Sequence, residues 1–320
     1  MAYQLKSDES VPDGIKRIAD EQIEKAVAQL TDQTDDSPDE AVHDARKRLK
    51  QIRALLRLVR DEIDEDIYHR ENASFRDAGR LLSDVRDAQV NLETLNKLTK
   101  YFADYISPNA FEDLRQALMV QIRTVNERVF EQNNATEKAA LMLLEAQERI
   151  KALPIEADNW SALKGGFKKV YHQGYKDFPQ AFNKPSAENF HEWRKRVKDL
   201  WYQLRILQPI WPGLIKEMAN QTKELADYLG DDHDLVVLRQ LLLDQPELLG
   251  EQAELDILLG LIDRRRMELQ LSAKALGKRI YAEKPRRFVK RLKAYWQVWQ
   301  SQINQPPVEQ MRSHLESAKV

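Results

Sequence analysis

Residues 43–57 read HDARKRLKQIRALLR, and this segment has two different faces when it is placed on a helix. Successive side chains of an α-helix are turned by about 100°, so residues three and four apart share a face. The basic side chains then gather around His43, whereas Leu49, Ile52 and Leu56 lie on the opposite side. One face is suited to a hydrophobic core, and the other is a row of positive charges.

A similar segment follows 148 residues later, where residues 191–205 read HEWRKRVKDLWYQLR. A histidine leads both segments, and arginine, lysine, lysine and a final arginine recur in register. Two further pairs keep the same order at nearly the same offset: 79–90 with 226–237, and, more weakly, 14–23 with 166–175. Repetition of this kind predicts two halves built on one plan. We place the halves at 1–153 and 154–305, followed by a tail at 306–320.

The composition predicts an all-α fold. Charged residues make up 32% of the chain, which has only 10 glycines and long stretches without proline. Helix interiors exclude proline and disfavour glycine, so the prolines mark the joints between about ten helices, and we expect no strands. One helix is expected from Pro38 to about Asp64, because Ser37 can cap it and Asp39 and Glu40 favour its first turn.

Several classes of protein are excluded or disfavoured. The chain has no cysteine, so disulfides, thiolate zinc sites and a cysteine nucleophile are absent. The longest apolar runs are far shorter than the roughly 18 residues that a membrane-spanning helix needs. The first residues, MAYQLKSDES, do not resemble a secretory signal. We therefore expect a cytoplasmic protein that does not associate with a membrane.

The net charge of -2 is a cancellation between blocks of opposite sign. Residues 41–60 carry seven basic and one acidic side chain, and residues 264–293 carry twelve and two. Residues 1–40 and 221–263 are strongly acidic. The segment 264–293 could extend an anion-binding surface or neutralise the acidic stretch before it, and we expect a mixture of the two. The total therefore says little about the ligand, because binding responds to the local field.

A row of arginine, lysine and histidine suits a ligand that offers phosphates at regular intervals. Arginine holds phosphate oxygens bidentately, lysine supplies a compact charge, and histidine donates hydrogen bonds. The alternative is a solvated helix face with local ion pairs, which the repetition of the row disfavours. The candidate binding residues on the two helices are His43, Arg46, Lys47, Lys50, Arg53, Arg57, His191, Arg194, Lys195, Lys198, Tyr202 and Arg205.

Alignment of the two halves adds four positions to this set. Arg17 corresponds to Lys169, and Arg76 corresponds to Lys223. We expect these cations to extend the basic surface, although each could equally be a solvated helix charge.

The two His-x-x-Arg-Lys-x-x-Lys segments are each followed by a helix with closely spaced acidic residues, at Asp84 and Asp87 or at Asp231–Asp234. This arrangement resembles the CHAD domain, an α-helical domain named for its histidines, over roughly residues 8–300. The resemblance implies two four-helix bundles related by a pseudo-twofold axis, plus a C-terminal helix. It also implies that the basic helix faces of both halves form a central surface that binds inorganic polyphosphate without catalysis.

The sequence departs from the family pattern at two positions. Trp201 stands where the first half has Arg53, and Asp227 stands where it has Arg80, so we expect the second half to hold the ligand less tightly. Many relatives also carry a triphosphate-tunnel domain with a Glu-x-Glu-x-Lys signature. No such signature is found here, and we expect a stand-alone module.

Two other functions stay open from the sequence. Asp231, Asp232, His233 and Asp234 offer metal-binding groups, but adjacent residues on a helix point in different directions, so we predict neither a metal nor another cofactor. We expect Asp84, Asp87, Asp231 and Asp234 to orient the basic side chains or to cap helices. A metal-dependent phosphohydrolase acting on polyphosphate or a phosphorylated small molecule is the second hypothesis.

The third hypothesis is a scaffold that recruits other proteins to polyphosphate granules through its acidic surfaces. The leading hypothesis is non-catalytic binding of polyphosphate. Under it the partner is inorganic polyphosphate, with granule proteins as further partners. Aromatic residues at 288, 295, 296 and 299 follow helical spacing, so we assign them to the core rather than to base stacking. Nucleic acid is therefore not an expected partner.

Overall fold

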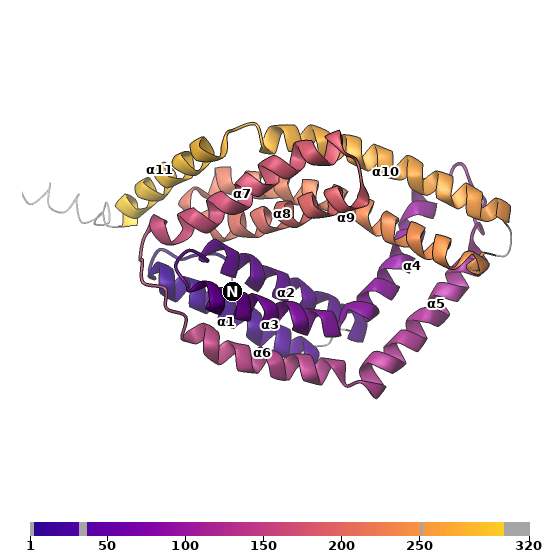
Figure 1. The fold of residues 1–320 in the computed structure, drawn as a ribbon, viewed down its shortest axis with the longest axis horizontal. Coiled ribbons are helices and arrows are strands. Elements are labelled where there is room, and N and C mark those ends of the chain that lie inside the picture. Colours follow the sequence, from indigo (N-terminus) through magenta and orange to yellow (C-terminus); the bar gives the residue numbers. More distant parts are fainter. Residues whose placement is uncertain (1–2, 32–36, 250–251, 304–320) are drawn as a thin grey trace, which may run out of the picture.

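The computed structural model describes residues 3–31, 37–249 and 252–303. Within these ranges it contains eleven α-helices and no strand, which confirms the all-α prediction (Figure 1). In this part of the chain no helix is long and apolar enough to cross a membrane. The predicted tail at 306–320 lies outside the described residues.

The α-helices have the following bounds: α1 Val11–Leu30, α2 Pro38–Leu58, α3 Glu65–Leu81, α4 Ser83–Tyr101, α5 Glu112–Asn126, α6 Ala135–Lys151, α7 Trp160–Asn183, α8 Ala187–Ile206, α9 Pro212–Asp244, α10 Gln252–Ile280 and α11 Pro285–Ile303. A π-helix at Glu127–Gln132 joins α5 to α6, and 3-10 turns at Gln208–Ile210 and Pro246–Leu248 flank α9.

The start of α2 agrees with the sequence prediction, and its end does not. The Glu40 backbone N–H donates to the Ser37 hydroxyl at 3.4 Å, and the Ser37 N–H donates to the Glu40 carboxylate at 3.3 Å. This reciprocal pair is a capping box. The helix stops at Leu58 rather than near Asp64, because Asp64 caps the next helix by accepting the Asp66 N–H at 2.8 Å.

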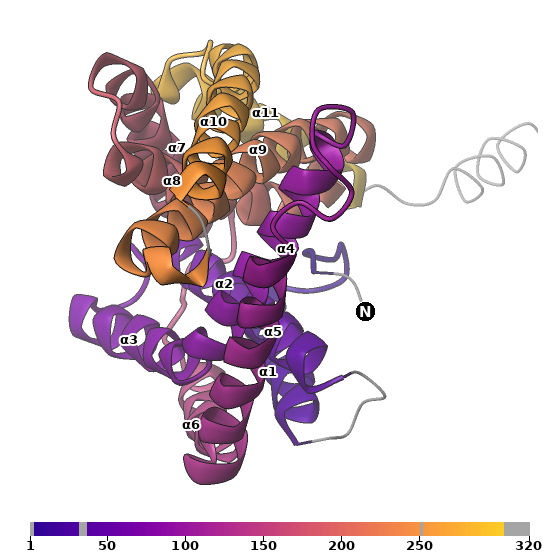
Figure 2. The same ribbon diagram turned by 90° about the vertical axis from the view of Figure 1, so that its right-hand side faces the viewer.

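The helices form two bundles that lie one above the other in Figure 1. Helices α1, α2, α3 and α6 pack together in one bundle, and α7, α8, α9 and α10 pack in the other, with α11 against α7 (Figures 1 and 2). Helix α2 packs against α8 where the bundles meet. The division near Pro154 and a pseudo-twofold relation between the halves stay predictions.

Helices α4 and α5 leave the first bundle and join the second. They form a hairpin whose apolar residues pack against α9 and α10 in a second hydrophobic core. Leu95 and Phe102 of α4 and Leu114 of α5 lie in this core with Leu238 of α9 and Ile262 of α10. Residues of α4 and α5 therefore stabilise α9 and α10, which follow much later in the sequence.

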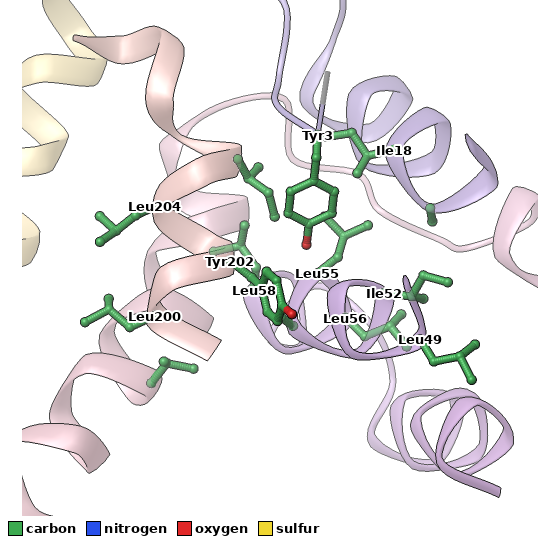
Figure 3. Close-up of a cluster of buried hydrophobic side chains, with 14 of the residues drawn as sticks. Tyr3, Ile18, Leu49, Ile52, Leu55, Leu56, Leu58, Leu200, Tyr202 and Leu204 are labelled. Atoms are coloured by element: carbon green, nitrogen blue, oxygen red, sulfur yellow. The ribbon is translucent and has the colours of Figure 1, made fainter. Parts of the chain in front are cut away.

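Buried contacts fix α2 relative to α8. Figure 3 shows Tyr3 and Tyr202 beside Leu55 and Leu58 of α2, and the two tyrosine rings meet edge to face at 6.3 Å. The Tyr3 hydroxyl donates to the carbonyl of Gln51, also on α2, at 2.8 Å. The basic faces of the two helices are consequently held in a fixed relation.

The pair Gly165–Gly166 lets α7 pack closely on the end of α2. A Cβ atom at Gly166 would lie 2.1 Å from the Arg57 carbonyl oxygen and 2.2 Å from that of Leu58. Only glycine leaves room for this backbone approach.

Candidate functional site

The basic faces of α2 and α8 open onto one cleft between the bundles. Its cavity has a volume of about 880 Å³, and α4 and α9 supply the rest of its walls. We call it the basic cleft. Eleven of the predicted binding residues line it: His43, Arg46, Lys47, Lys50, Arg53, Arg57, His191, Arg194, Lys195, Lys198 and Tyr202.

Five cations of the basic cleft have no acidic partner. Among the described residues, no carboxylate lies within 4.0 Å of Arg46, Lys50, Arg53, Arg194 or Lys198. The Arg46 guanidinium donates to the Gly79 carbonyl at 2.6 Å, and that of Arg53 donates to the Asn72 side-chain oxygen at 3.1 Å. These acceptors are neutral, and within the described residues no ion pair neutralises the five charges. We call these five residues the inner cations.

The inner cations repel one another. The side chain of Lys50 is exposed to the water of the cleft, and the surrounding protein partly desolvates it. This desolvation, followed by the charges of Lys198, Arg46 and Arg194, lowers the pKa of Lys50 to about 7. Desolvation and the charge of Arg194 likewise lower the pKa of Lys198 to about 8. An anion that entered the cleft would relieve this repulsion.

The surroundings of the cleft lower the pKa of its three histidines. Burial and then the charge of Arg86 lower the pKa of His43, and burial and then Arg194 lower that of His191. The ring of His233, from α9, lies 4.5 Å from the ring of His191, and burial followed by Arg194 lowers its pKa to about 3. The lowered pKa values favour the neutral imidazoles, which offer hydrogen bonds rather than charge.

Other cations of the basic cleft are paired with carboxylates. These pairs are Lys47 with Asp44 at 3.3 Å, Arg57 with Asp199 at 3.3 Å, Arg86 with Glu93 at 2.8 Å, Lys97 with Asp231 at 3.2 Å, and Lys195 with Glu192. The uncompensated charge is therefore concentrated on the inner cations.

The paired acidic residues of the two halves have two different roles. Asp87 and Asp234 act on Arg46 and Arg194 respectively, since each carboxylate partly opposes the lowering of the pKa of its arginine. Asp84 and Asp231 act on the same two arginines in this way and also form ion pairs, with Arg128 at 2.8 Å and with Lys97 at 3.2 Å. The expectation that these carboxylates support basic side chains therefore fits both carboxylates of each half.

The residues Asp231–Asp234 do not converge. Asp232 is buried and pairs with Arg266 at 3.0 Å, whereas Asp231 pairs with Lys97 and His233 faces His191. In the described ranges no group of three histidine, aspartate or glutamate side chains is placed to hold a metal ion.

Five predicted residues lie outside the lining of the basic cleft: Arg17, Arg76, Lys169, Arg205 and Lys223. Arg17 forms ion pairs with Glu9 at 2.6 Å and Glu21 at 3.0 Å. Ion pairs with the neighbouring Asp77 and Asp227 hold Arg76 and Lys223 respectively.

The other two have different surroundings. The Arg205 guanidinium lies over the Tyr3 ring at 5.2 Å and the Trp201 ring at 5.6 Å. Lys169 lines a separate hollow beside α11. The weak alignment of 14–23 with 166–175 therefore does not bring Arg17 and Lys169 to one site.

The structure adds residues that the helix pattern alone did not include. Arg86 and Lys97 of α4, Arg196 of α8 and His233 of α9 line the basic cleft, as does Trp201. The signal for Arg86 and His233 was present, because both lie in the acidic segments that follow the two basic helices. Lys97 carries no such signal, since only the packing of α4 against α9 brings it there.

Comparison with known proteins agrees with this architecture. The sequence model of the CHAD domain matches residues 17–243. The crystal structure of the CHAD domain from the plant Ricinus communis is similar with a TM-score of 0.61 and 16% identity, covering 89% of this chain and 96% of that one. PptA from Streptomyces chartreusis gives a TM-score of 0.58 and 12% identity, covering 86% and 100%.

At these identities the solved structures show a shared fold alone. No curated protein matches the sequence. The match of the family model spans most of the chain, including α2, α8 and the described helices between them. The chain therefore belongs to the CHAD domain family.

Proposed function

We propose that this protein binds inorganic polyphosphate in the basic cleft and does not catalyse a reaction on it. Polyphosphate binding is a general property of the family. The observation that carries the proposal is the convergence of four inner cations from two helices, Arg46 and Lys50 from α2 and Arg194 and Lys198 from α8. None of the four forms an ion pair with a carboxylate of the described ranges. Association with polyphosphate granules is part of the same proposal.

The energetics of the cleft favour a ligand with many closely spaced charges. Holding cations together in partly desolvated surroundings is unfavourable unless an anion compensates them. A single phosphate can reach only some of them, whereas a linear chain of phosphates can contact the inner cations of both helices at once. Each contact also releases counterions, so the affinity is expected to fall steeply with salt.

The test is calorimetric titration with long-chain polyphosphate at low salt. The cleft variant combines Arg46→Glu, Lys50→Glu, Arg194→Glu and Lys198→Glu. A control variant with the same change in charge combines Lys100→Glu, Lys138→Glu, Lys216→Glu and Lys278→Glu, which are exposed and line neither the basic cleft nor the hollows beside α11. Circular dichroism checks that both variants stay helical.

We expect the cleft variant to lose roughly hundredfold or more in affinity, and the control variant to change far less. The dependence of log K on log salt should also become shallower by about 0.7 for each lost phosphate contact. Equal binding by the cleft variant and the wild-type protein would contradict the proposal. Release of phosphate from the polymer by the purified protein, with magnesium or manganese added, would contradict its non-catalytic part.

A further inference from the structure

A second basic surface lies between α7 and α11, which pack side by side (Figure 1). It lines two adjoining hollows that share Lys164, Lys168 and Arg286. We define the second basic surface as Lys164, Lys168, Lys169, Lys284, Arg286, Arg287, Lys290 and Lys293, all of which are exposed.

The charge of this surface is almost uncompensated. In the described part of the chain, none of its eight cations has a carboxylate within salt-bridge distance. Asp61 lines one of the hollows, and Glu283, which precedes α11, pairs with Arg291 at 2.9 Å instead.

The earlier part of the basic segment 264–293 behaves differently. Arg264 and Arg265 pair with Glu268 at 3.4 and 3.3 Å, and Arg266 pairs with Asp232 at 3.0 Å. Within 264–293 the first three arginines thus neutralise acidic residues, whereas Arg286, Arg287, Lys290 and Lys293 of α11 form no ion pair in the described part of the chain.

Aromatic packing holds the two basic helix faces together. The Phe288 ring stacks on Tyr171 with ring centres 4.1 Å apart and on Phe167 at 5.8 Å, and Trp160 contacts Trp296 at 5.9 Å. All five rings are buried. Because α7 and α11 turn these rings inward, their cations recur along the outward faces at intervals of about one helical turn, or roughly 6 Å.

We propose that the second basic surface binds a second stretch of polyphosphate, which makes the protein bivalent for the polymer. The inference rests on the proposed function, because it assigns the same ligand to a second place. Repeated cations that line hollows between two helices suit a linear polymer lying along them.

Two other polyanions fit this surface less well. Trp160, Phe288 and Trp296 are buried, which leaves the partly exposed Tyr175 rather than a row of rings on which nucleic-acid bases could stack. The cations line hollows rather than flank a protruding apolar face, which an interfacial membrane-binding helix would need.

The experiment compares a surface variant with the cleft variant and the control variant already described. The surface variant combines Lys164→Glu, Lys168→Glu, Arg286→Glu and Lys290→Glu. Calorimetry with tripolyphosphate at low salt counts binding sites, and titration with long-chain polyphosphate measures the gain from bivalent binding. Each protein is also titrated with a single-stranded oligonucleotide and with phosphatidylserine vesicles.

We expect two tripolyphosphate sites in the wild-type protein and in the control variant. The surface variant and the cleft variant should each keep one site. For long-chain polyphosphate the surface variant should lose about tenfold or more in affinity, because linked sites gain from effective concentration.

A surface variant with the stoichiometry and affinity of the wild-type protein would overturn the inference. The inference would also be overturned if the second basic surface bound the oligonucleotide or the vesicles but not tripolyphosphate. A cleft variant that keeps both sites would instead contradict the proposed function, so the two failures are distinguishable.

Discussion

Lys50 has a position on its helix that the sequence predicts and a pKa that only the fold explains. Its position four residues after Arg46 places both side chains on one face of α2, which the helical period predicts. Its lowered pKa depends on Lys198 and Arg194, which come from α8. The sequence thus predicts which side chains share a face but not how closely the two faces approach.

The pKa of Lys50 leads to a prediction about stability and pH. An unfolded chain keeps this lysine protonated up to its ordinary pKa of 10.5, whereas desolvation and the neighbouring cations lower its pKa to about 7 in the folded protein. The unfolded state therefore binds more protons between these values, and stability without ligand should rise with pH through this window. Lys50→Gln should raise the melting temperature at pH 6 and flatten this rise.

Thermal unfolding from pH 6 to pH 9 measures the effect, with Lys100→Gln as the exposed control. An unchanged pH profile in Lys50→Gln would show that Lys50 stays fully charged in the folded protein. Calorimetry adds a second measurement, because polyphosphate binding at pH 8 should take up protons, and the observed heat should then vary with the ionisation enthalpy of the buffer.

At the scale of helices, capping residues in the sequence predicted where helices begin. The sequence did not predict how far apart the packed helices lie. Ser37 and Glu40 identify the start of α2 because capping is local. The predicted end at Asp64 was wrong, because Asp64 is equally suited to cap the following helix and the period alone does not separate the two roles.

Gly166 gives a prediction for the contact between α2 and α7. In Gly166→Ala the new methyl group would overlap the carbonyl oxygens of Arg57 and Leu58, and backbone atoms cannot rotate away. We expect the free energy of unfolding to fall by about 1–3 kcal/mol, as for other overpacked sites.

Denaturant unfolding measures this change against Gly260→Ala. Gly260 lies within α10 and has no neighbouring atom within 4 Å of the added group, so alanine should stabilise the helix by roughly 0.5–1 kcal/mol. If both substitutions stabilised the protein, α7 would have to lie further from α2 than described.

At the scale of the whole molecule, the basic cleft joins the two bundles. Its inner cations come from α2 in one bundle and α8 in the other, so a bound polymer would contact both. The repeat in the sequence predicted two halves with similar basic helices, and the resemblance to the CHAD domain implied that these helices share a site. The repeat could not predict that α4 leaves its own bundle and carries Arg86 and Lys97 to the same cleft, because that path depends on apolar packing against α9 and α10.

A bridging ligand should stabilise the folded protein. Polyphosphate at 100 times its dissociation constant is expected to add about 2.7 kcal/mol to the free energy of unfolding, because it binds the folded state preferentially. The melting temperature should therefore rise with polymer concentration, and the rise should shrink at high salt. Differential scanning calorimetry measures it, and an equal rise in the cleft variant would place the ligand elsewhere.

The hairpin of α4 and α5 also has a consequence for synthesis on the ribosome. Leu95, Phe102 and Leu114 emerge well before Leu238 and Ile262, the residues that cover them. The ribosome adds about 5–20 residues per second, so the apolar side of the hairpin stays exposed to water for on the order of ten seconds. During that interval the nascent chain is exposed to aggregation and to chaperone binding at this one element, while the first bundle already has all four of its helices.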